Sequence, residues 1–322
     1  MKKTIDVTAL GELLIDFTAH GTSEQGNPLL EANPGGAPCN VLAMLQKLGK
    51  STAFVGKVGK DGFGRQLRLA VEAAGIDTSG LCWDDEIPTT LAVVHTLPGG
   101  DREFSFYRKP GADIDLRADE LKPELLENCR IFHFGTLSLT DEPCRSATIK
   151  AYETAKAAGA LISFDPNLRE PLWPDLEAAR EAICWGLARC DVLKISDNEI
   201  LFMTGEADFD KAAAILRAKY PNIKLMNVTA GKDGSISYYK DLRVFRPGCP
   251  LGGTVETTGA GDTFCACALN YVLDHGLEDL SEEDLGQMLR FANTAAYLVT
   301  TRKGALRSMP NLDEIEQTLA RY

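Results

Sequence analysis

The sequence holds one run of small residues that leads directly into an apolar helix, Thr257-Thr258-Gly259-Ala260-Gly261-Asp262-Thr263-Phe264. Free N–H groups at the start of a helix, together with the helix dipole, favour anions, and glycines let a ligand approach the backbone. Gly259, Ala260 and Gly261 are therefore candidates for holding the charge on a transferring phosphoryl group. Asp262 is a candidate general base for a substrate hydroxyl. Taken alone, the run also fits a plain loop with Asp262 as a helix cap.

Outside this run, short β-rich segments alternate with longer amphipathic segments. The predicted strands are Val7–Ile15, Thr52–Val58, Arg130–Phe134, Leu161–Asp165, Val192–Ile195 and Ile223–Thr229. The predicted helices are Cys39–Leu48, Phe63–Ala74, Pro143–Ala158, Leu176–Ala188, Asp208–Ala218, Ala260–Asp274, Glu282–Thr300 and one from about Leu312 after an Asn311 cap. This alternation predicts a mainly parallel sheet covered by helices on both faces.

Two stretches interrupt the alternation. Residues 16–35 are polar and rich in glycine. Residues 88–108 contain two alternating runs, Thr89–Thr96 and Glu103–Tyr107, on either side of Pro98-Gly99-Gly100-Asp101, which predicts a β-hairpin. A few extra strands beside the parallel sheet indicate a lid over its edge.

Composition restricts the classes of protein to which the chain can belong. It has 322 residues, of which 44% are hydrophobic and 25% charged, which suits one large α/β domain or two modest ones. The formal net charge of −12 argues against nucleic acid and membrane as partners. Nine scattered cysteines without a Cys-x-x-Cys pair predict reduced thiols and no zinc site. Glu12 and Asp16 interrupt the first apolar run, so we expect no signal peptide and a cytoplasmic protein.

A second polar turn, Asn33-Pro34-Gly35-Gly36-Ala37-Pro38-Cys39-Asn40, precedes the first predicted helix. Gly35 and Gly36 expose backbone amides, and Asn40 offers a donor and an acceptor that suit sugar hydroxyls. Asp16 follows the first predicted strand, and ligands of open α/β sheets gather at the carboxyl ends of strands. Asp16 is thus a candidate for holding two vicinal hydroxyls, unless it is an exposed turn residue.

Three further polar turns follow the last three predicted strands. Arg169, after the fourth strand, supplies a fixed fork of donors. Glu199, after the fifth, can reach Mg²⁺ through water. Thr229 and Gly231, at the end of the sixth, lie where a nucleotide would be expected. Each turn alone is a weak signal, but together the five turns lie on one side of one predicted sheet.

These motifs resemble those of the ribokinase-like (PfkB) carbohydrate kinase family, and the resemblance covers nearly the whole chain. Gly35–Gly64 is similar to the family's first signature and Thr257–Leu269 to its second, which is highly specific. Within the family, Phe104–Arg108, Phe164–Arg169 and Lys194–Glu199 resemble bacterial and plant fructokinases. The resemblance implies ATP-dependent phosphorylation of D-fructose to fructose 6-phosphate, with Mg²⁺.

The same resemblance implies the architecture. It predicts one domain over residues 1–322, folded as a three-layer α/β/α sandwich with a mainly parallel central sheet. A small β lid would come from segments at about 12–35 and 88–115, which are inserted in the α/β body. A homodimer through the lid is the family expectation for the oligomer.

The resemblance also assigns roles to individual residues. It makes Asp262 the catalytic base and Gly259, Ala260 and Gly261 the anion hole. The implied sugar contacts are Asp16, Gly35, Gly36, Asn40, Phe106, Arg108 and Arg169. The implied ATP contacts are Lys194, Thr229, Gly231, Gly234 and Asn293, and Glu199 is the implied link to Mg²⁺.

Two departures from the family pattern carry predictions of their own. Glu256 stands where the family usually has an Asp that helps to hold a monovalent cation, so we expect weak or absent activation by K⁺, with the carboxylate pairing with a nearby donor instead. Cys39 stands beside the implied sugar site in place of Ala or Ser. We expect the helix start to lower its pKa, and bound fructose to protect it from thiol reagents.

Rival functions stay open at this point, one of which is another sugar kinase of the same family. 2-Keto-3-deoxygluconate kinase has a similar pattern, and its acid substrate would need a cationic partner for the carboxylate, for which Arg108 and Arg169 could serve. The run Pro110-Gly111-Ala112-Asp113 favours fructokinase instead. A sugar-sensing pseudokinase would bind without turnover, but Asp262 and the intact glycine run argue against it.

Overall fold

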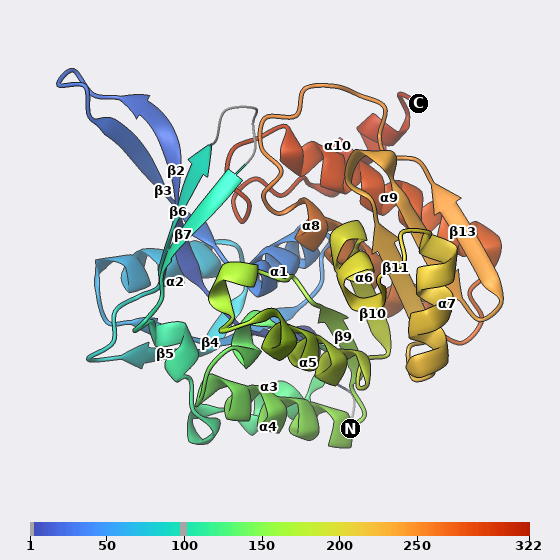
Figure 1. The fold of residues 1–322 in the computed structure, drawn as a ribbon, viewed down its shortest axis with the longest axis horizontal. Helices are drawn as coiled ribbons and strands as arrows, with labels where there is room; N and C mark the ends of the chain where they lie inside the picture. Colours follow the sequence, from blue (N-terminus) through green and yellow to red (C-terminus); the bar gives the residue numbers. More distant parts are fainter. Residues whose placement is uncertain (1–2, 97–101) are drawn as a thin grey trace.

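The computed structural model describes residues 3–96 and 102–322, which build two sheets flanked by helices (Figure 1). The larger sheet has nine strands in the order β13-β12-β11-β10-β9-β8-β1-β4-β5, and the smaller has four in the order β3-β2-β6-β7. The strands are β1 Ile5–Leu10, β2 Leu14–Thr22, β3 Pro28–Gly35, β4 Thr52–Gly59, β5 Asp77–Asp84, β6 Leu91–Thr96, β7 Arg102–Tyr107, β8 Cys129–Gly135, β9 Leu161–Asp165, β10 Val192–Ser196, β11 Leu225–Thr229, β12 Ser235–Tyr239 and β13 Leu242–Arg246.

Helices cover both faces of the larger sheet. They are α1 Ala37–Lys47, α2 Gly62–Ala73, α3 Pro123–Glu127, α4 Cys144–Ala157, α5 Leu176–Leu187, α6 Asp197–Thr204, α7 Phe209–Lys219, α8 Ala260–His275, α9 Glu282–Thr300 and α10 Leu312–Leu319. One buried core joins α1, α2, α8, α9 and α10 to the sheet, and a second joins the helices from α3 to α7. In β8, Ile131 belongs to the first core, whereas Phe132 and Phe134 belong to the second.

The larger sheet is parallel from β5 to β11 and ends in two antiparallel strands, β12 and β13. The predicted α/β class and the three layers are therefore confirmed. Asn311 caps α10 as predicted, because its side chain accepts a hydrogen bond from the backbone N–H of Glu314. The sequence pattern does not predict β5, β12, β13, α3 or the short helix α6.

The prediction of one strand over Val7–Ile15 is wrong. β1 ends at Leu10, and β2 begins at Leu14 in the other sheet. The chain changes direction between them beside α1, where a Cβ added at Gly11 would lie 2.7 Å from Pro38 Cγ. Asp16 is therefore the third residue of β2, and it lies in the smaller sheet instead of at the carboxyl end of a body strand.

The smaller sheet contains the predicted hairpin. β6 and β7 pair in antiparallel fashion from Leu91–Tyr107 to Thr96–Arg102, which confirms its two strands. The predicted turn at 98–101 lies outside the described residues. β2 and β3, from the polar stretch 16–35, form a second antiparallel pair that projects from the body (Figure 1). Their outer halves are exposed, so the stretch lacks the alternating apolar pattern that predicts a strand.

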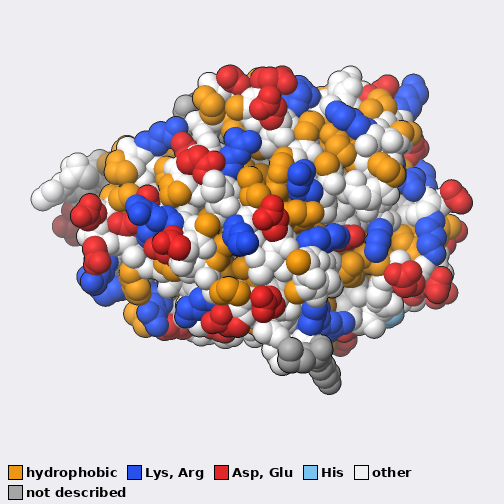
Figure 2. Space-filling model, turned by 90° about the horizontal axis from the view of Figure 1, so that it is seen from below, with side chains coloured by type: hydrophobic (Ala, Val, Ile, Leu, Met, Phe, Trp, Pro, Cys, Tyr) orange, Lys and Arg blue, Asp and Glu red, His pale blue; other side chains and the backbone are white. Residues whose placement is uncertain are grey.

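The surface shows no continuous region of one charge in the view of Figure 2, where cationic and anionic side chains intermingle. Within residues 3–96 and 102–322, no helix combines the length and the apolar character needed to cross a membrane.

Candidate functional site

The turn before α8 builds the centre of the site. Gly259 has a φ of 81°, in the left-handed region that favours glycine, and it caps α8 without a side-chain hydrogen bond. A Cβ at Gly259 would lie 2.8 Å from Ala305 Cβ, so a larger residue would not fit. The first N–H groups of α8 have no side-chain acceptor at their cap, as an anion site requires.

Asp262 lies in the first turn of α8 and is 9% exposed. Asn40, from α1, donates a hydrogen bond from Nδ2 to Asp262 Oδ2 over 2.8 Å. Burial raises the pKa of Asp262, while the Asn40 hydrogen bond, Lys194 and Arg169 oppose the increase. Asn40 Oδ1 is buried and accepts no hydrogen bond from the described residues. A donor from a ligand, such as a sugar hydroxyl, would satisfy it.

Asp16 lies close to the other predicted sugar contacts. A Cβ added at Gly35 would be only 2.1 Å from Asp16 Oδ2, so glycine is needed for the carboxylate to occupy this position. Burial, with the charges of Glu256 and Asp262, raises the pKa of Asp16 to about 7, and Arg169 opposes the shift.

Glu12 fixes the start of α1 at the same place. Its Oε1 accepts a hydrogen bond from Ala37 N over 2.8 Å, while the N-cap residue Gly36 provides no side-chain acceptor. A Cβ at Gly36, where φ is 130°, would lie 2.3 Å from the Glu12 carbonyl oxygen. Glu12 therefore replaces the missing cap and positions Asn40 toward Asp262.

These residues surround a cavity of about 600 Å³, called here the acceptor cavity. The predicted residues that line it are Asp16, Gly36, Asn40, Phe106, Arg169, Lys194, Gly259, Gly261 and Asp262. Lining residues that the sequence analysis did not single out include Glu12, Leu14, Leu137, Asn167, Thr254 and Val255. Asn167 has a φ of 47°, and the polar turn after β9 was the signal that could have identified it.

A second cavity of about 440 Å³, called here the nucleotide cavity, adjoins the first. Predicted residues that line it are Thr229, Gly231, Gly234, Asn293, Ala260 and Gly261. Thr254, Thr257 and Gly261 line both cavities. The turn before α8 is therefore the partition between them, so a group transferred from one cavity to the other must pass beside its amides.

Arg108 does not line either cavity, contrary to its prediction as a sugar contact. Its Nε donates to Asp113 Oδ2 over 2.8 Å, NH1 to Thr140 Oγ1 over 3.0 Å and NH2 to the Leu137 carbonyl over 2.8 Å. The side chain is 3% exposed. Arg108 therefore anchors the end of β7 to the body and acts on the acceptor cavity through Leu137 and through its charge, which lowers the pKa of Glu12 against the effect of burial.

Both carboxylate oxygens of Glu199 also have hydrogen-bond partners within the protein. Its Oε1 accepts from Leu168 N and its Oε2 from Ser196 N, each over 2.8 Å. Burial alone would raise the pKa of Glu199, but Lys194 and these backbone N–H groups lower it. Glu199 completes the capping box of α6. Its water-mediated link to Mg²⁺ stays a prediction.

The expected low pKa of Cys39 is wrong. Cys39 is fully buried in α1, and burial together with the charge of Glu12 raises the pKa of its thiol. The start of α1 does not offset this increase in the thiol pKa, since no solvent reaches the sulfur.

The expected pairing of Glu256 is confirmed: its Oε1 accepts a hydrogen bond from Thr258 Oγ1 over 2.6 Å and its Oε2 accepts one from Gly304 N over 3.1 Å.

Comparison with known proteins matches residues 4–312 to the pfkB family carbohydrate kinase model. The chain is 44% identical to Probable fructokinase-2 of Arabidopsis thaliana, covering 94% of this chain and 92% of that protein. It is 41% identical to Fructokinase-1 of Zea mays, covering 97% of both.

Solved structures of kinases are also similar to this chain along nearly its whole length. The fructokinase of Xylella fastidiosa with bound ATP has a TM-score of 0.88 at 30% identity, covering 100% of this chain and 99% of that chain. A double mutant of the Vibrio cholerae fructokinase, with fructose, ADP and potassium bound, has a TM-score of 0.86 at 27% identity, covering 99% and 100%. An E. coli protein described as ribokinase II, in complex with ATP and Mg²⁺, has the same TM-score, identity and coverage.

Proposed function

The chain belongs to the pfkB family of carbohydrate kinases, and we propose that it transfers the γ-phosphoryl group of ATP to the 6-hydroxyl of D-fructose. Relatives named fructokinases match along nearly their whole lengths, which supports this substrate. The observation that carries the proposal is the meeting of the two cavities at Gly261, with Asp262 in the wall of the acceptor cavity.

The proposed reaction follows from this arrangement. Asp262 takes the proton of the 6-hydroxyl as the hydroxyl oxygen forms a bond to the γ-phosphorus of ATP. The bond from that phosphorus to the bridging oxygen breaks, and the electron pair leaves with ADP. The N–H groups of Gly259, Ala260 and Gly261 stabilise the negative charge on the transferring group. Positioning supplies most of the remaining rate enhancement.

We propose ATP in the nucleotide cavity, near Thr229, Gly231, Gly234 and Asn293. Solved neighbours that hold ATP, ADP and metal ions support a nucleotide and a metal ion for this fold. Mg²⁺ would neutralise phosphate charge. Both Glu199 oxygens already accept backbone hydrogen bonds. The site therefore suits a metal ion that is bound mainly by the phosphates and that Glu199 would contact through water.

The charges of the acceptor cavity favour a neutral sugar over an acid one. Its ionisable lining residues are the carboxylates Glu12, Asp16, Glu256 and Asp262 and the cations Arg169 and Lys194. Of the two arginines that could pair with a ketodeoxygluconate carboxylate, Arg108 is bound to Asp113, which leaves Arg169. Fructose is uncharged and needs no cationic partner, and its hydroxyl groups can donate hydrogen bonds to the carboxylates and to Asn40.

Purified protein should consume ATP with fructose and little with 2-keto-3-deoxygluconate, measured by coupled ADP release. ADP release with ketodeoxygluconate alone would favour the rival kinase. Sugar-dependent nucleotide binding without turnover would indicate a pseudokinase. The cytoplasm and the homodimer through the lid stay predictions from the sequence.

Thiol labelling tests the assignment of the nucleotide cavity. Cys249 is half-buried and lines that cavity, whereas Cys39 is fully buried. We expect a maleimide to label Cys249 several-fold more slowly when ATP is bound, because the nucleotide covers it. Cys82 and Cys184, also half-buried, are internal controls whose rates stay unchanged. Equal Cys249 rates with and without ATP, or rapid labelling of Cys39, would contradict the placement.

Potassium activation tests the role of Glu256. Because both its oxygens already accept hydrogen bonds, from Thr258 and Gly304, we expect weak or no activation by K⁺. The measurement is kcat during a KCl titration, with tetramethylammonium chloride holding the ionic strength constant. Glu256→Asp shortens the side chain by one methylene and should introduce a potassium dependence. A saturable, potassium-specific increase in the unmodified protein would show that the prediction is wrong.

A further inference from the structure

A buried ion pair lies beneath the turn that separates the cavities. Lys194 Nζ is 3.2 Å from Asp165 Oδ1 and 3.1 Å from Oδ2, and the two side chains are 8% and 4% exposed. Asp165 ends β9 and Lys194 lies in β10, its neighbour in the sheet. The polar turn after β9 drew attention to Arg169, and neither the sequence analysis nor the proposed reaction gives Asp165 a role.

The ammonium of Lys194 faces the anion hole. It lines the acceptor cavity, and a Cβ added at Gly261 would lie 3.0 Å from Nζ. Because Gly261 has no side chain, it leaves room for the cation directly beside the amides that would hold the transferring phosphoryl group. Asp165, on the other side of the ammonium, does not line the cavity within the described residues.

We infer that Asp165 is a positioning residue for phosphoryl transfer, which holds the Lys194 ammonium beside Gly261 and keeps it charged there. This inference rests on the proposed function. Asp165 Oδ1 also accepts a hydrogen bond from Asn167 N over 3.3 Å, so one carboxylate fixes both the cation and the turn that carries Asn167 into the acceptor cavity. Asp165 itself touches no substrate.

Burial alone would favour the neutral amine of Lys194. The charges of Asp165, Glu199 and Asp262 outweigh it and raise the pKa of Lys194. Burial raises the pKa of Asp165 to about 7, with Lys194 opposing the shift, so both members of the pair are charged above that pH. Buried His133 and Cys265 also face this region, but burial and Lys194 lower the pKa of His133, and burial raises that of Cys265, so both stay neutral at working pH. Without the charge of Asp165, less would oppose the effect of burial, and the pKa of Lys194 would fall.

The test is Asp165→Asn, which keeps the shape of the side chain and the acceptor for Asn167 N. We expect kcat to fall by about 10- to 100-fold, with little change in the fructose KM. This is less than the roughly 10²- to 10³-fold that removing an oxyanion-hole donor costs, because Lys194 itself stays in the site. In the unmodified protein Lys194 stays charged up to high pH, because its pKa is raised, whereas in the variant it would lose its proton at lower pH, so the basic limb of the kcat–pH profile should move down into the pH range of the assay. A purely structural role would leave that limb in place.

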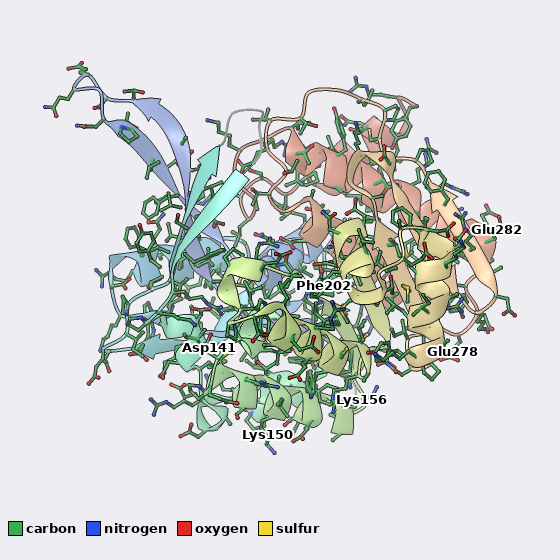
Figure 3. The ribbon with its side chains drawn as sticks, in the orientation of Figure 1. Asp141, Lys150, Lys156, Phe202, Glu278 and Glu282 are labelled. Carbon is green, nitrogen blue, oxygen red and sulfur yellow. The ribbon has the colours of Figure 1, made fainter. Side chains whose placement is uncertain are left out.

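The matched control is Asp191→Asn. Asp191 also binds a lysine, through Oδ2 to Lys156 Nζ over 2.9 Å, but it precedes β10, at the end of the sheet away from the cavities. Lys156 lies on α4, at the border of the body in Figure 3. This variant should keep the kcat and pH profile of the unmodified protein, and thermal melting checks the fold of both variants.

A double variant separates the inference from a general loss of stability. If Asp165 acts through Lys194, Asp165→Asn should add little to the loss of kcat that Lys194→Met causes alone. Independent, multiplying losses, or an unshifted basic limb, would overturn the inference while leaving fructose phosphorylation intact. The proposed function is tested by a different result: it is wrong if the unmodified protein does not phosphorylate fructose. Even with that result, the ATP affinity measured by calorimetry without sugar should be lower in Lys194→Met than in the unmodified protein.

Discussion

Replacing Asp262 by Asn should lower kcat by about 10²- to 10⁴-fold, the usual contribution of a general base. The substitution retains the size of the side chain and an oxygen that can accept the hydrogen bond from Asn40 Nδ2, which is 2.8 Å long. It removes the group that takes the proton from the sugar hydroxyl. The fructose KM should change little, because the lost interaction belongs to the transition state.

The matched control is Asp274→Asn, in the last turn of the same helix, α8. Asp274 is exposed and pairs with Lys50 far from both cavities. Its loss should leave kcat within about twofold of the unmodified protein, as is usual for a surface site. Near-normal turnover in the Asp262 variant would remove Asp262 from the role of catalytic base and leave the helix-cap interpretation.

Replacing Asp16 by Ala should act on sugar binding. A lost hydrogen bond to a charged group costs about 1.5–3 kcal/mol, or about 10- to 150-fold in the fructose KM. The KM of ATP should stay nearly constant, because Asp16 lies in the acceptor cavity and not in the nucleotide cavity. Steady-state kinetics with each substrate varied in turn measures both constants.

Gly35→Ala tests the same contact from the other side. Its added methyl would lie 2.1 Å from Asp16 Oδ2 and must displace that carboxylate or the strand. We expect an increase in the fructose KM with little change for ATP. Equal increases for both substrates in the Asp16 and Gly35 variants would point to a structural role for Asp16 instead.

A pH dependence follows from the same carboxylate. The pKa of Asp16 in the sugar-free protein is raised to about 7, first by burial, so the group is largely protonated below that pH. Only the carboxylate accepts two charge-assisted hydrogen bonds from hydroxyls. The fructose KM should therefore increase as pH falls below about 7 and level off above it. The slope should disappear in Asp16→Asn, and a slope that persists there would belong to another group.

Part of this site could be predicted from the sequence, because local patterns specify local structure. Thr257–Asp262 combines small residues with a helix start, and it builds the partition between the cavities at that place. Polar turns after the body strands converge because parallel strands end at one edge of the sheet. Thr229 and Lys194 therefore lie near Gly261 although each comes from a different strand.

The remaining features depend on partners that are distant in three dimensions. Nothing in the run Phe104–Arg108 shows that Asp113 will bind Arg108 and withdraw it from the cavity. The position of Cys39 at a helix start indicates a low pKa, but burial behind Glu12 outweighs the helix. The break at Gly11 is likewise set by the approach of Pro38, which the hydrophobic pattern of Val7–Ile15 does not contain.

Many of the residues that line the acceptor cavity come early in the chain and those that handle phosphate come later, which affects how such an enzyme can diverge. The four-stranded sheet comes from residues 14–35 and 91–107, and it supplies Asp16 and Phe106 to the acceptor cavity. Lys194, the 257–262 turn and Asn293 all come later in the sequence. Changes confined to the first third of the chain can therefore alter the accepted sugar without touching the groups that handle phosphate. A chimera joined in the connection between β7 and α3 should change acceptor preference only in part and keep one phosphoryl-transfer apparatus, because Leu137, Asn167 and Arg169 also line the acceptor cavity and follow the junction.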